Sequence, residues 1–346
     1  MNTQPDLRNF TLQQLQNLAA ELGENTTRTE NLFAQIHSPN INSFDDLNNI
    51  SAAFISKIRT RASLTSLTMQ QKTASTDGTL KYLFRLNDNL NIETVLIPSG
   101  RRHTLCLSTQ AGCAMGCKFC RTASMGLRRN LLTYEIIGQI LPIMQELKKN
   151  SSIINNIVLM GMGEPLNNTQ NVISAIKIMQ HSKGLNFSPR KITISTCGII
   201  PEMKNFAAAA EINIALSLHA ADNNTRNRIM PINRKYPLDQ LLQSCREIAS
   251  DDRPILIEYI LLRNINDSPQ QAQTLAGILA DIPCKINLIP YNPTPELPFQ
   301  PSSSDSTKTF LKIIHESGHF VRLRHSRGND IAAACGQLAT QSKNNE

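Results

Sequence analysis

The feature that most constrains this chain is a group of three cysteines, Cys113, Cys117 and Cys120, in the run GCAMGCKFC that starts at Gly112. Iron–sulfur clusters are held by cysteine thiolates, and a cuboidal [4Fe-4S] cluster usually takes four of them. Three thiolates on one short loop would hold three irons and leave the fourth iron open for a chelating ligand. The spacing therefore predicts a redox enzyme built around such a cluster.

Two other uses of these cysteines fit their spacing less well. A structural zinc site normally takes four ligands, with one close pair joined to a second pair further along, and no second Cys or His pair lies nearby. A disulfide framework needs a far higher cysteine density than 8 in 346 residues. We therefore expect these thiols to stay reduced.

The composition predicts a protein of the cell interior that is long enough for two domains. Residues 1–8 carry an acid and no apolar stretch, so no secretory signal is expected, and no segment approaches the roughly 18 apolar residues that span a membrane. With 346 residues, 40% of them hydrophobic, the chain can bury one large core and support a small accessory domain. We expect a cytoplasmic monomer without membrane contact.

The net charge of +8 is unevenly distributed. Residues 1–95 hold 8 Lys and Arg against 9 Asp and Glu, which leaves 27 against 18 for residues 96–346. The part that carries the three cysteines therefore holds all of the positive excess. Such a balance fits a polyanionic partner, although many soluble proteins are mildly basic without binding nucleic acid.

Residues 1–75 are expected to form a small helical accessory domain. Leucines recur on one helical face within Phe10–Leu22, with Thr11 as N-cap. The same apolar spacing extends over Asp45–Leu64 and predicts a second helix.

Residues 76–98 are expected to form a hairpin that connects this domain to the next. A turn is predicted at Thr76–Gly78, after which apolar and polar residues alternate from Leu80 to Leu86. A second apolar run follows at Val95–Ile97 and would be the return strand.

Residues 99–325 alternate short apolar strands with helices, the pattern of a parallel sheet built from βαβ units. Strands are expected at Thr104–Ser108, Ile157–Met160, Ile192–Ser195, Ile214–Leu218, Ile255–Leu261 and Ile286–Ile289, with a further run at Phe320–Leu323. Helices are expected between them at Tyr134–Leu147, Val172–Gln180, Leu238–Ala249 and Pro269–Ala280, the last with Ser268 as N-cap.

About six such units fall short of the eight that close a full barrel. The predicted fold class is therefore α/β, an incomplete parallel (β/α) barrel with a helical N-terminal domain and a C-terminal tail over residues 326–346. Its lateral opening would suit a substrate as large as folded RNA.

Chemistry-bearing residues follow the predicted strands. Active sites of parallel barrels lie at the carboxyl ends of the strands, and candidate residues end or follow five of them: Cys113, Gly163–Glu164, Ser195, Ser217–His219 and Asn292. Glycines would let the backbone approach a ligand closely, and a carboxylate can accept from an ammonium group. For any one of these residues alone, an ordinary loop cap is the competing interpretation.

Seven runs occur in order along the chain: Glu93–Pro98, Leu105–Cys113, Met160–Pro165, Ile194–Thr196, Leu216–His219, Met230–Asn233 and Arg327–Leu338. Together they resemble the RlmN/Cfr family of radical S-adenosylmethionine (SAM) RNA methyltransferases. The resemblance implies a [4Fe-4S] cluster on Cys113, Cys117 and Cys120, with SAM on the open iron. It also implies SAM contacts from Gly163, Glu164, Ser195, Ser217, Leu218, His219 and Asn292. For His219 the competing interpretation is a core histidine that is hydrogen-bonded to a carbonyl.

That family methylates an sp2 carbon of adenine, and the resemblance implies two SAM molecules per turnover. Cys335 would take a methyl group from one SAM, and a 5′-deoxyadenosyl radical from the other would abstract a hydrogen from it, so that the carbon radical adds to the ring. Cys106 would resolve the protein–RNA adduct through a transient disulfide with Cys335. Glu93 would accept the ring proton.

Pro165 and Arg327–Gly328 resemble the branch that methylates carbon-2 more than the carbon-8 branch. The expected substrate is an adenosine in the peptidyl-transferase region of 23S rRNA, with the adenosine beside the anticodon of tRNA as a second candidate. A flavodoxin or ferredoxin would supply electrons, and a thiol reductant would reopen the disulfide. Methylation at carbon-8, another radical-SAM enzyme that needs no methyl-carrying Cys335, and a metal-holding RNA-binding protein are the alternatives.

Three further cysteines, Cys197, Cys245 and Cys284, match no motif of the family. Free cysteine is among the most buried residue types, so we expect all three to act as small buried hydrophobic residues.

Overall fold

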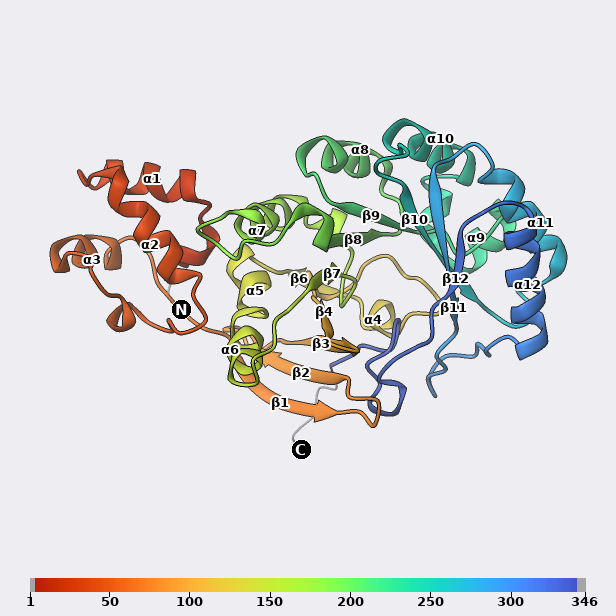
Figure 1. The fold of residues 1–346 in the computed structure, drawn as a ribbon, viewed down its shortest axis with the longest axis horizontal. Coiled ribbons are helices and arrows are strands. Elements are labelled where there is room, and N and C mark those ends of the chain that lie inside the picture. The colour runs from red at the N-terminus through yellow and green to blue at the C-terminus, as the bar shows by residue number, and fades with distance from the viewer. Residues whose placement is uncertain (1–3, 341–346) are drawn as a thin grey trace.

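The structure is a computed structural model that describes residues 4–340, so that the ends of the predicted accessory domain (1–3) and C-terminal tail (341–346) lie outside the described residues. Its centre is one ten-stranded sheet in the order β1-β2-β3-β4-β7-β8-β9-β10-β11-β12 (Figure 1). The strands are β1 Thr68–Ala74, β2 Leu80–Arg85, β3 Asn91–Ser99, β4 Arg102–Cys106, β7 Asn156–Leu159, β8 Ile192–Thr196, β9 Asn213–Ser217, β10 Ile255–Leu261, β11 Cys284–Pro290 and β12 Val321–Leu323; β5 Gln110–Gly112 and β6 Leu127–Asn130 form a separate pair.

From β4 to β12 the neighbouring strands of the large sheet are parallel. Apolar residues face one another along the register, as in Leu105 against Ile157 and Ile257 against Ile286, and these side chains are buried. Strands buried on both faces are expected to be apolar in this way. The sheet ends at β1 and β12 without closing, so the predicted α/β fold with an incomplete parallel barrel is confirmed.

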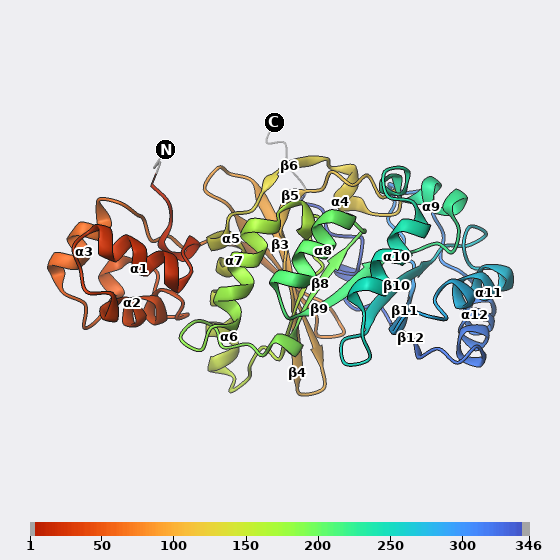
Figure 2. The same ribbon diagram turned by 90° about the horizontal axis from the view of Figure 1, so that it is seen from above.

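Helices cover the parallel part of the sheet, and from above α7, α8 and α10 lie over one face of it (Figure 2). The helices are α4 Arg121–Ser124, α5 Thr133–Gly138, α6 Leu141–Lys149, α7 Thr169–Gln180, α8 Ile200–Ala209, α9 Asn223–Ile229, α10 Leu238–Ile248, α11 Pro269–Ile278 and α12 Ser304–Glu316. Ser268 caps α11 as predicted, accepting from the Gln271 N–H at 3.2 Å.

The single helix predicted over Tyr134–Leu147 is wrong, because α5 ends at Gly138 and α6 begins at Leu141. Pro142 lies in the first turn of α6, where its missing N–H is tolerated, whereas inside a continuous helix it would clash with the carbonyl of Gly138. The break lets the side chain of Gln139 bond the backbone of Ser108 in both directions, at 2.9 Å each.

The N-terminal domain contains α1 Leu12–Glu21, α2 Thr29–Ile36 and α3 Ala52–Arg59, and it lies beside the sheet in Figure 1. Thr11 caps α1 as predicted, in a capping box with Gln14. The single helix predicted over Asp45–Leu64 is wrong. A 3-10 turn at Phe44–Asp46 is followed by irregular chain with Asn49 at positive φ, and α3 starts only after its N-cap, Ser51.

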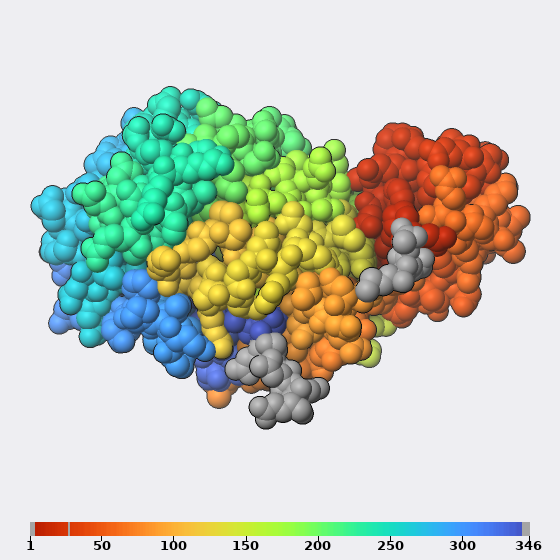
Figure 3. Space-filling model, turned by 180° about the vertical axis from the view of Figure 1, so that it is seen from behind, coloured from red at the N-terminus to blue at the C-terminus, as the bar shows by residue number. Residues whose placement is uncertain are grey.

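The predicted hairpin is β2 and β3, paired antiparallel, and β1 adds an unpredicted outer strand to it. The turn between β1 and β2 holds the segment that follows β12, which we call the C-terminal segment (residues 326–340). Asp330 accepts from Ser75 Oγ at 2.6 Å and Thr76 N at 3.0 Å, and the Gly328 N–H donates to Asp77 at 2.9 Å. In Figure 3 the dark blue atoms of this part of the chain lie between the orange hairpin and yellow atoms.

Among residues 4–340 no helix combines the length and the apolar character needed to cross a membrane.

Candidate active site

A cavity of about 230 Å³ lies where the ends of the parallel strands meet the three-cysteine loop (residues 113–120) and the C-terminal segment. Most of the predicted site residues line it: Cys106, Cys113, Cys117, Cys120, Gly163, Glu164, Ser195, Ser217, His219 and Cys335. Glu93, Leu218 and Asn292 do not line it, and their positions are described below. One cavity thus collects thiols from three separate regions of the sequence.

The backbone conformation at the start of the three-cysteine loop requires a glycine. Gly112 has φ +79°, and a Cβ there would lie 1.9 Å from the carbonyl oxygen of Gly126, so no other residue fits. The Cys113 N–H donates to that same carbonyl at 3.0 Å. Further along the loop, the Lys118 N–H donates to the Ile229 carbonyl at 2.9 Å, which ties the loop to the end of α9.

Burial makes ionisation of these three thiols unfavourable. Burial, together with the neighbouring thiols, raises the pKa of Cys113 to about 12 and raises the pKa values of Cys117 and Cys120 as well. A bound cation removes this penalty, because metal ligation requires thiolates. Across the described part of the chain no three His, Cys, Asp or Glu side chains converge on a single ion. In a cuboidal cluster each thiolate takes a different iron, so three cysteines of one short loop at the cavity are a donor set that fits a [4Fe-4S] group.

The loop after β7 also depends on a glycine. Gly163 has φ +104°, and a Cβ there would lie 2.6 Å from the Cβ of Gln110. The carboxylate of Glu164 accepts from the Cys197 N–H at 2.8 Å and the Leu166 N–H at 3.1 Å, and burial raises its pKa. Glu164 therefore ties the β7 loop to the β8 loop. The side chains of Thr196 and Cys197 also hydrogen-bond this carboxylate.

Ser195 and Ser217, from neighbouring strands, place their hydroxyl oxygens 3.4 Å apart at the cavity wall. His219 follows β9 with a φ of 58°, and its Nδ1 accepts from the Ile260 N–H at 3.1 Å. Its ring meets Phe119 of the three-cysteine loop edge-on at 5.0 Å. Burial lowers the pKa of His219 to about 3, so the ring is a neutral part of the wall at physiological pH.

Two charged cavity residues, Glu258 and Arg324, were missed by sequence reasoning. Glu258 lies opposite Ser217 in the register; its Oε1 accepts from Asn287 Nδ2 at 2.9 Å. Its Oε2 has no hydrogen-bond partner among the described residues and lies 3.9 Å from Arg324 Nη1. A carboxylate inside the apolar run Ile255–Leu261 was the signal that could have identified Glu258, since buried strands are otherwise apolar.

Arg226, also missed, is fully buried behind the wall. Its guanidinium donates to the carbonyls of Cys197 at 2.8 Å and Leu218 at 3.0 Å, and to Asn233 Oδ1 at 3.0 Å. Burial lowers the pKa of Arg226 to about 10. The side chain of Leu218 is buried in the core, so its part in the site is the carbonyl that Arg226 holds.

Besides the three loop cysteines, Cys106, Cys197 and Cys335 line the cavity, and Cys106 and Cys335 differ in their surroundings. Cys106 is the last residue of β4 and is 8% exposed, and burial raises the pKa of its thiol to about 12, while the charge of Arg324 acts in the opposite direction. Cys335 is exposed on the C-terminal segment. Asn292, after β11, donates from Nδ2 to the Cys335 carbonyl at 3.4 Å, so it holds the segment instead of lining the cavity.

Glu93, on β3, lies behind the C-terminal segment. Its Oε1 is 3.1 Å from Lys81 Nζ, and its Oε2 accepts from the Ala339 N–H at 2.9 Å. The structure therefore brings Glu93 to the segment that carries Cys335 and leaves it outside the cavity itself.

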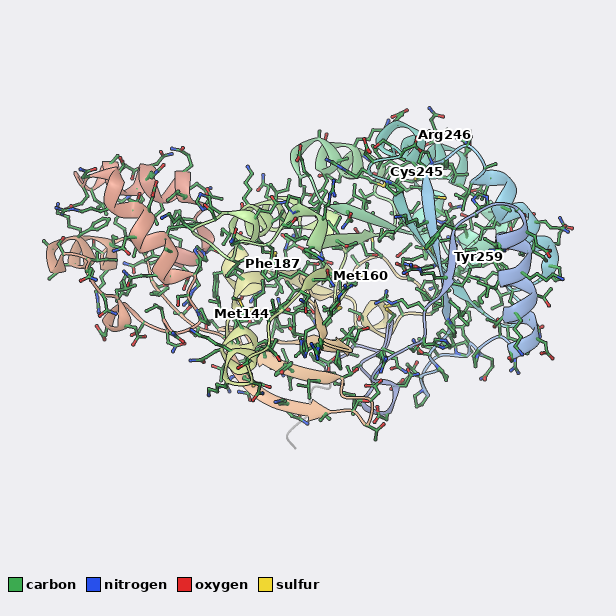
Figure 4. All side chains as sticks on the ribbon, viewed as in Figure 1. Met144, Met160, Phe187, Cys245, Arg246 and Tyr259 are labelled. Carbon is green, nitrogen blue, oxygen red and sulfur yellow. The ribbon has the colours of Figure 1, made fainter. Side chains whose placement is uncertain are left out.

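The cysteines without a motif match take three different positions. Cys245, on α10, is fully buried and lies in the outer helix layer of Figure 4, apart from Met160 at the centre of the molecule. Cys284 is only half-buried, unlike the prediction. Cys197 is buried, yet it lines the cavity and bonds Glu164 through its backbone.

Comparisons with known proteins agree with this geometry. Residues 107–275 match the Radical SAM superfamily, and residues 5–64 match the ribosomal RNA large subunit methyltransferase N-terminal domain. The chain is 42% identical over 343 residues to the dual-specificity RNA methyltransferase RlmN of Desulfotalea psychrophila, covering 97% of this chain and 95% of that one. It is 43% identical over 334 residues to RlmN of Geotalea uraniireducens, covering 96% of each.

A solved structure resembles the whole fold. The crystal structure of a radical SAM methyltransferase from Sphaerobacter thermophilus superimposes with a TM-score of 0.91 at 36% identity, over 96% of this chain and 98% of that one.

Proposed function

This chain belongs to the RlmN family of radical SAM RNA methyltransferases, and from that premise we propose that it methylates carbon-2 of an adenosine in 23S rRNA, with the adenosine beside the anticodon of tRNA as a second substrate. The observation that carries the proposal is the meeting of the three-cysteine loop with Cys106 and Cys335 at one cavity. Relatives with the name RlmN support the carbon-2 assignment over carbon-8.

In this proposal Cys113, Cys117 and Cys120 hold a [4Fe-4S] cluster. SAM is contacted by Gly163, Glu164, Ser195, Ser217 and His219, which line the cavity, and Leu218 and Asn292, which do not line it, complete the proposed set of contacts. When bound, the cluster and two SAM molecules per turnover supply the methyl group and the radical chemistry that an unreactive ring carbon requires. The protein's own part is to carry the carbon, move a proton and release the product.

Cys335 carries the carbon as S-methylcysteine. Its exposed position on a segment, with no place in a strand, allows the sulfur to serve both SAM and RNA. Addition of the carbon radical to the adenine ring leaves one unpaired electron, which the oxidised cluster would take back when bound, and Glu93 accepts the proton that leaves carbon-2. The position of Glu93 against the segment of Cys335 supports this pairing of roles.

Cys106 releases the product by attack on the Cys335 sulfur. The new S–S bond replaces the bond between that sulfur and the transferred carbon, which keeps the electron pair and takes a proton to become the methyl group. The disulfide must then take two electrons from a thiol reductant of the cytoplasm. Arg324 supports the step, because its charge opposes the effect of burial on the Cys106 thiol and favours the thiolate.

A low-potential donor such as flavodoxin or ferredoxin completes the proposed set of partners. The positive excess of residues 96–346 supports RNA binding through phosphate contacts.

The test is nucleoside analysis of RNA from cells with and without this chain. Purified 23S rRNA and tRNA are digested to nucleosides, and 2-methyladenosine and 8-methyladenosine are measured by mass spectrometry. We expect 2-methyladenosine to disappear from both RNAs in cells that lack the chain. Loss of 8-methyladenosine alone would overturn the carbon-2 assignment, and loss from rRNA alone would remove tRNA as a substrate.

A further inference from the structure

One ion pair holds the C-terminal segment on both sides of Cys335. Lys81 Nζ donates to the carbonyl of Ala332 at 3.3 Å, and it lies 3.1 Å from Glu93 Oε1. Glu93 Oε2 in turn accepts from the Ala339 N–H at 2.9 Å. Residues 332–339, with Cys335 near the middle, are thus bonded to Lys81 at one end and to Glu93 at the other.

The pair itself is well placed to hold a segment. Lys81 and Glu93 come from the neighbouring strands β2 and β3, whose register sets Leu83 opposite Glu93 and Lys81 opposite Val95. Their side chains are 17% and 7% exposed, so water screens their attraction less than it would at the surface. A hydrogen bond to a charged carboxylate is about twice as strong as one between neutral groups.

Other contacts of the segment do not involve this pair. The Gly336 carbonyl accepts from the Arg121 N–H at 2.8 Å, and the Leu338 carbonyl accepts from Thr122 Oγ1 at 2.6 Å. In both bonds the donor is uncharged: a backbone N–H in one and a hydroxyl group in the other. The charge of Glu93 therefore affects a defined subset of the anchors.

We propose that the Lys81–Glu93 ion pair is a clamp on the segment of Cys335, and that transfer of the ring proton to Glu93 opens it. The inference rests on the proposed role of Glu93 as proton acceptor. Lys81 is then a positioning residue, which acts on Cys335 through the segment.

The physical reason is the loss of one charge. The proton leaves carbon-2 of the adduct, its bonding electrons stay with the ring, and the carboxylate becomes a neutral carboxyl group. That group no longer attracts Lys81, and it accepts a weaker hydrogen bond from Ala339. The segment would be loosened after proton transfer, at the stage when the Cys335 sulfur must turn from the RNA toward Cys106.

The clamp can be tested by hydrogen–deuterium exchange of the full-length protein without RNA, so that no turnover is required. Glu93→Gln imitates the neutral carboxyl group, and Lys81→Met removes the cation. We expect amides of residues 333–339 to exchange about tenfold faster in both variants, the factor that corresponds to one lost hydrogen bond to a charged group. Exchange within the buried strand β8 serves as the folding control.

Two further variants make the comparison specific. Lys81→Arg keeps the charge and should keep slow exchange. Lys72→Met removes a lysine of the adjacent strand β1 that pairs with Glu146, and it should leave residues 333–339 unchanged. The double variant of Lys81→Met with Glu93→Gln should exchange faster than either single variant but by less than the product of the two single factors, because the shared ion pair can be lost only once.

Wild-type exchange of residues 333–339 in Glu93→Gln would overturn the clamp. The proposed function is scored separately, by RNA methylation with the same variant. If Glu93→Gln exchanges faster but methylates RNA normally, Glu93 helps to hold the C-terminal segment. It is then not the proton acceptor, and proton transfer does not open the clamp.

Discussion

The two thiols proposed to act on RNA belong to regions of opposite character. Cys106 ends β4 inside the ten-stranded sheet, paired with Val95 on one side and Val158 on the other. Cys335 lies on a segment without strand structure, held by separate bonds from Asn292, Lys81 and Glu93 to it or its neighbours. Sheet pairing fixes Cys106 from both sides, whereas the segment of Cys335 is held by single bonds to separate side chains.

The largest effect is expected from removing the carrier. Cys335→Ala should abolish RNA methylation, because the carbon to be transferred never reaches the protein. Its absorption from the iron–sulfur cluster and its SAM binding should remain, in contrast to Cys113→Ala, in which both should be lost. If purified Cys335→Ala formed measurable 2-methyladenosine, Cys335 would not carry the methyl carbon. The contrast between Cys106 and Cys335 would then have no bearing on the reaction.

The second effect separates the fixed thiol from the moving one. Cys106→Ala should still become methylated at Cys335 and still add to RNA, but the adduct should not be released. A covalent protein–RNA species should therefore accumulate and survive denaturing electrophoresis. If Cys106→Ala turns over RNA at the normal rate with no trapped species, Cys106 is not the resolving thiol.

A smaller effect is expected from Arg324, and it concerns pH. Because burial raises the pKa of Cys106 to about 12, its thiolate fraction, and hence its alkylation by iodoacetamide, should rise about tenfold per pH unit from pH 8 to pH 11. Arg324→Gln removes a cation that lowers this pKa, so the whole profile should move up by about one pH unit. Arg322→Gln, an exposed neighbour on β12, is the control. Coincident profiles for Arg324→Gln and wild type would show that Arg324 does not act on Cys106.

The smallest effect is expected at the far anchor of the segment. Asp330→Asn weakens the bonds from Ser75 and Thr76, and because Asp330 is exposed to solvent the amides of residues 328–333 should exchange only about threefold faster. RNA methylation should be retained. If Asp330→Asn instead abolished RNA methylation, the position of Cys335 would depend on this distant bond, and the bonds that hold the C-terminal segment would not act separately.

Patterns local in sequence predicted much of this molecule. The spacing of the three cysteines, the glycines around Glu164 and the apolar runs of the parallel strands all act over a few residues. Pro142 was an equally local signal, and the prediction of one continuous helix overlooked it. Strand β1 was missed for another reason, because Thr68–Ala74 is an almost wholly exposed edge strand without the alternation that marks a half-buried one.

The parts of the site that sequence reasoning missed depend on distance along the chain. Glu258 and Arg324 meet only because β10, β11 and β12 lie side by side in the sheet. Lys81 reaches Glu93 through the register of β2 and β3, and Ala339 lies 246 positions further along the chain than Glu93. Single-residue chemistry gives no sign of such pairings.

The bond between Ser75 and Asp330 joins residues 255 positions apart. A ribosome adds roughly 5–20 residues per second, so Ser75 waits at least ten seconds or so for its partner to be made. During that interval the residues of the turn between β1 and β2 have been synthesised, while the thiol-bearing segment does not yet exist. Synthesis therefore separates the two proposed redox thiols in time, because Cys335 is added to the chain 229 residues after Cys106 (335 − 106 = 229).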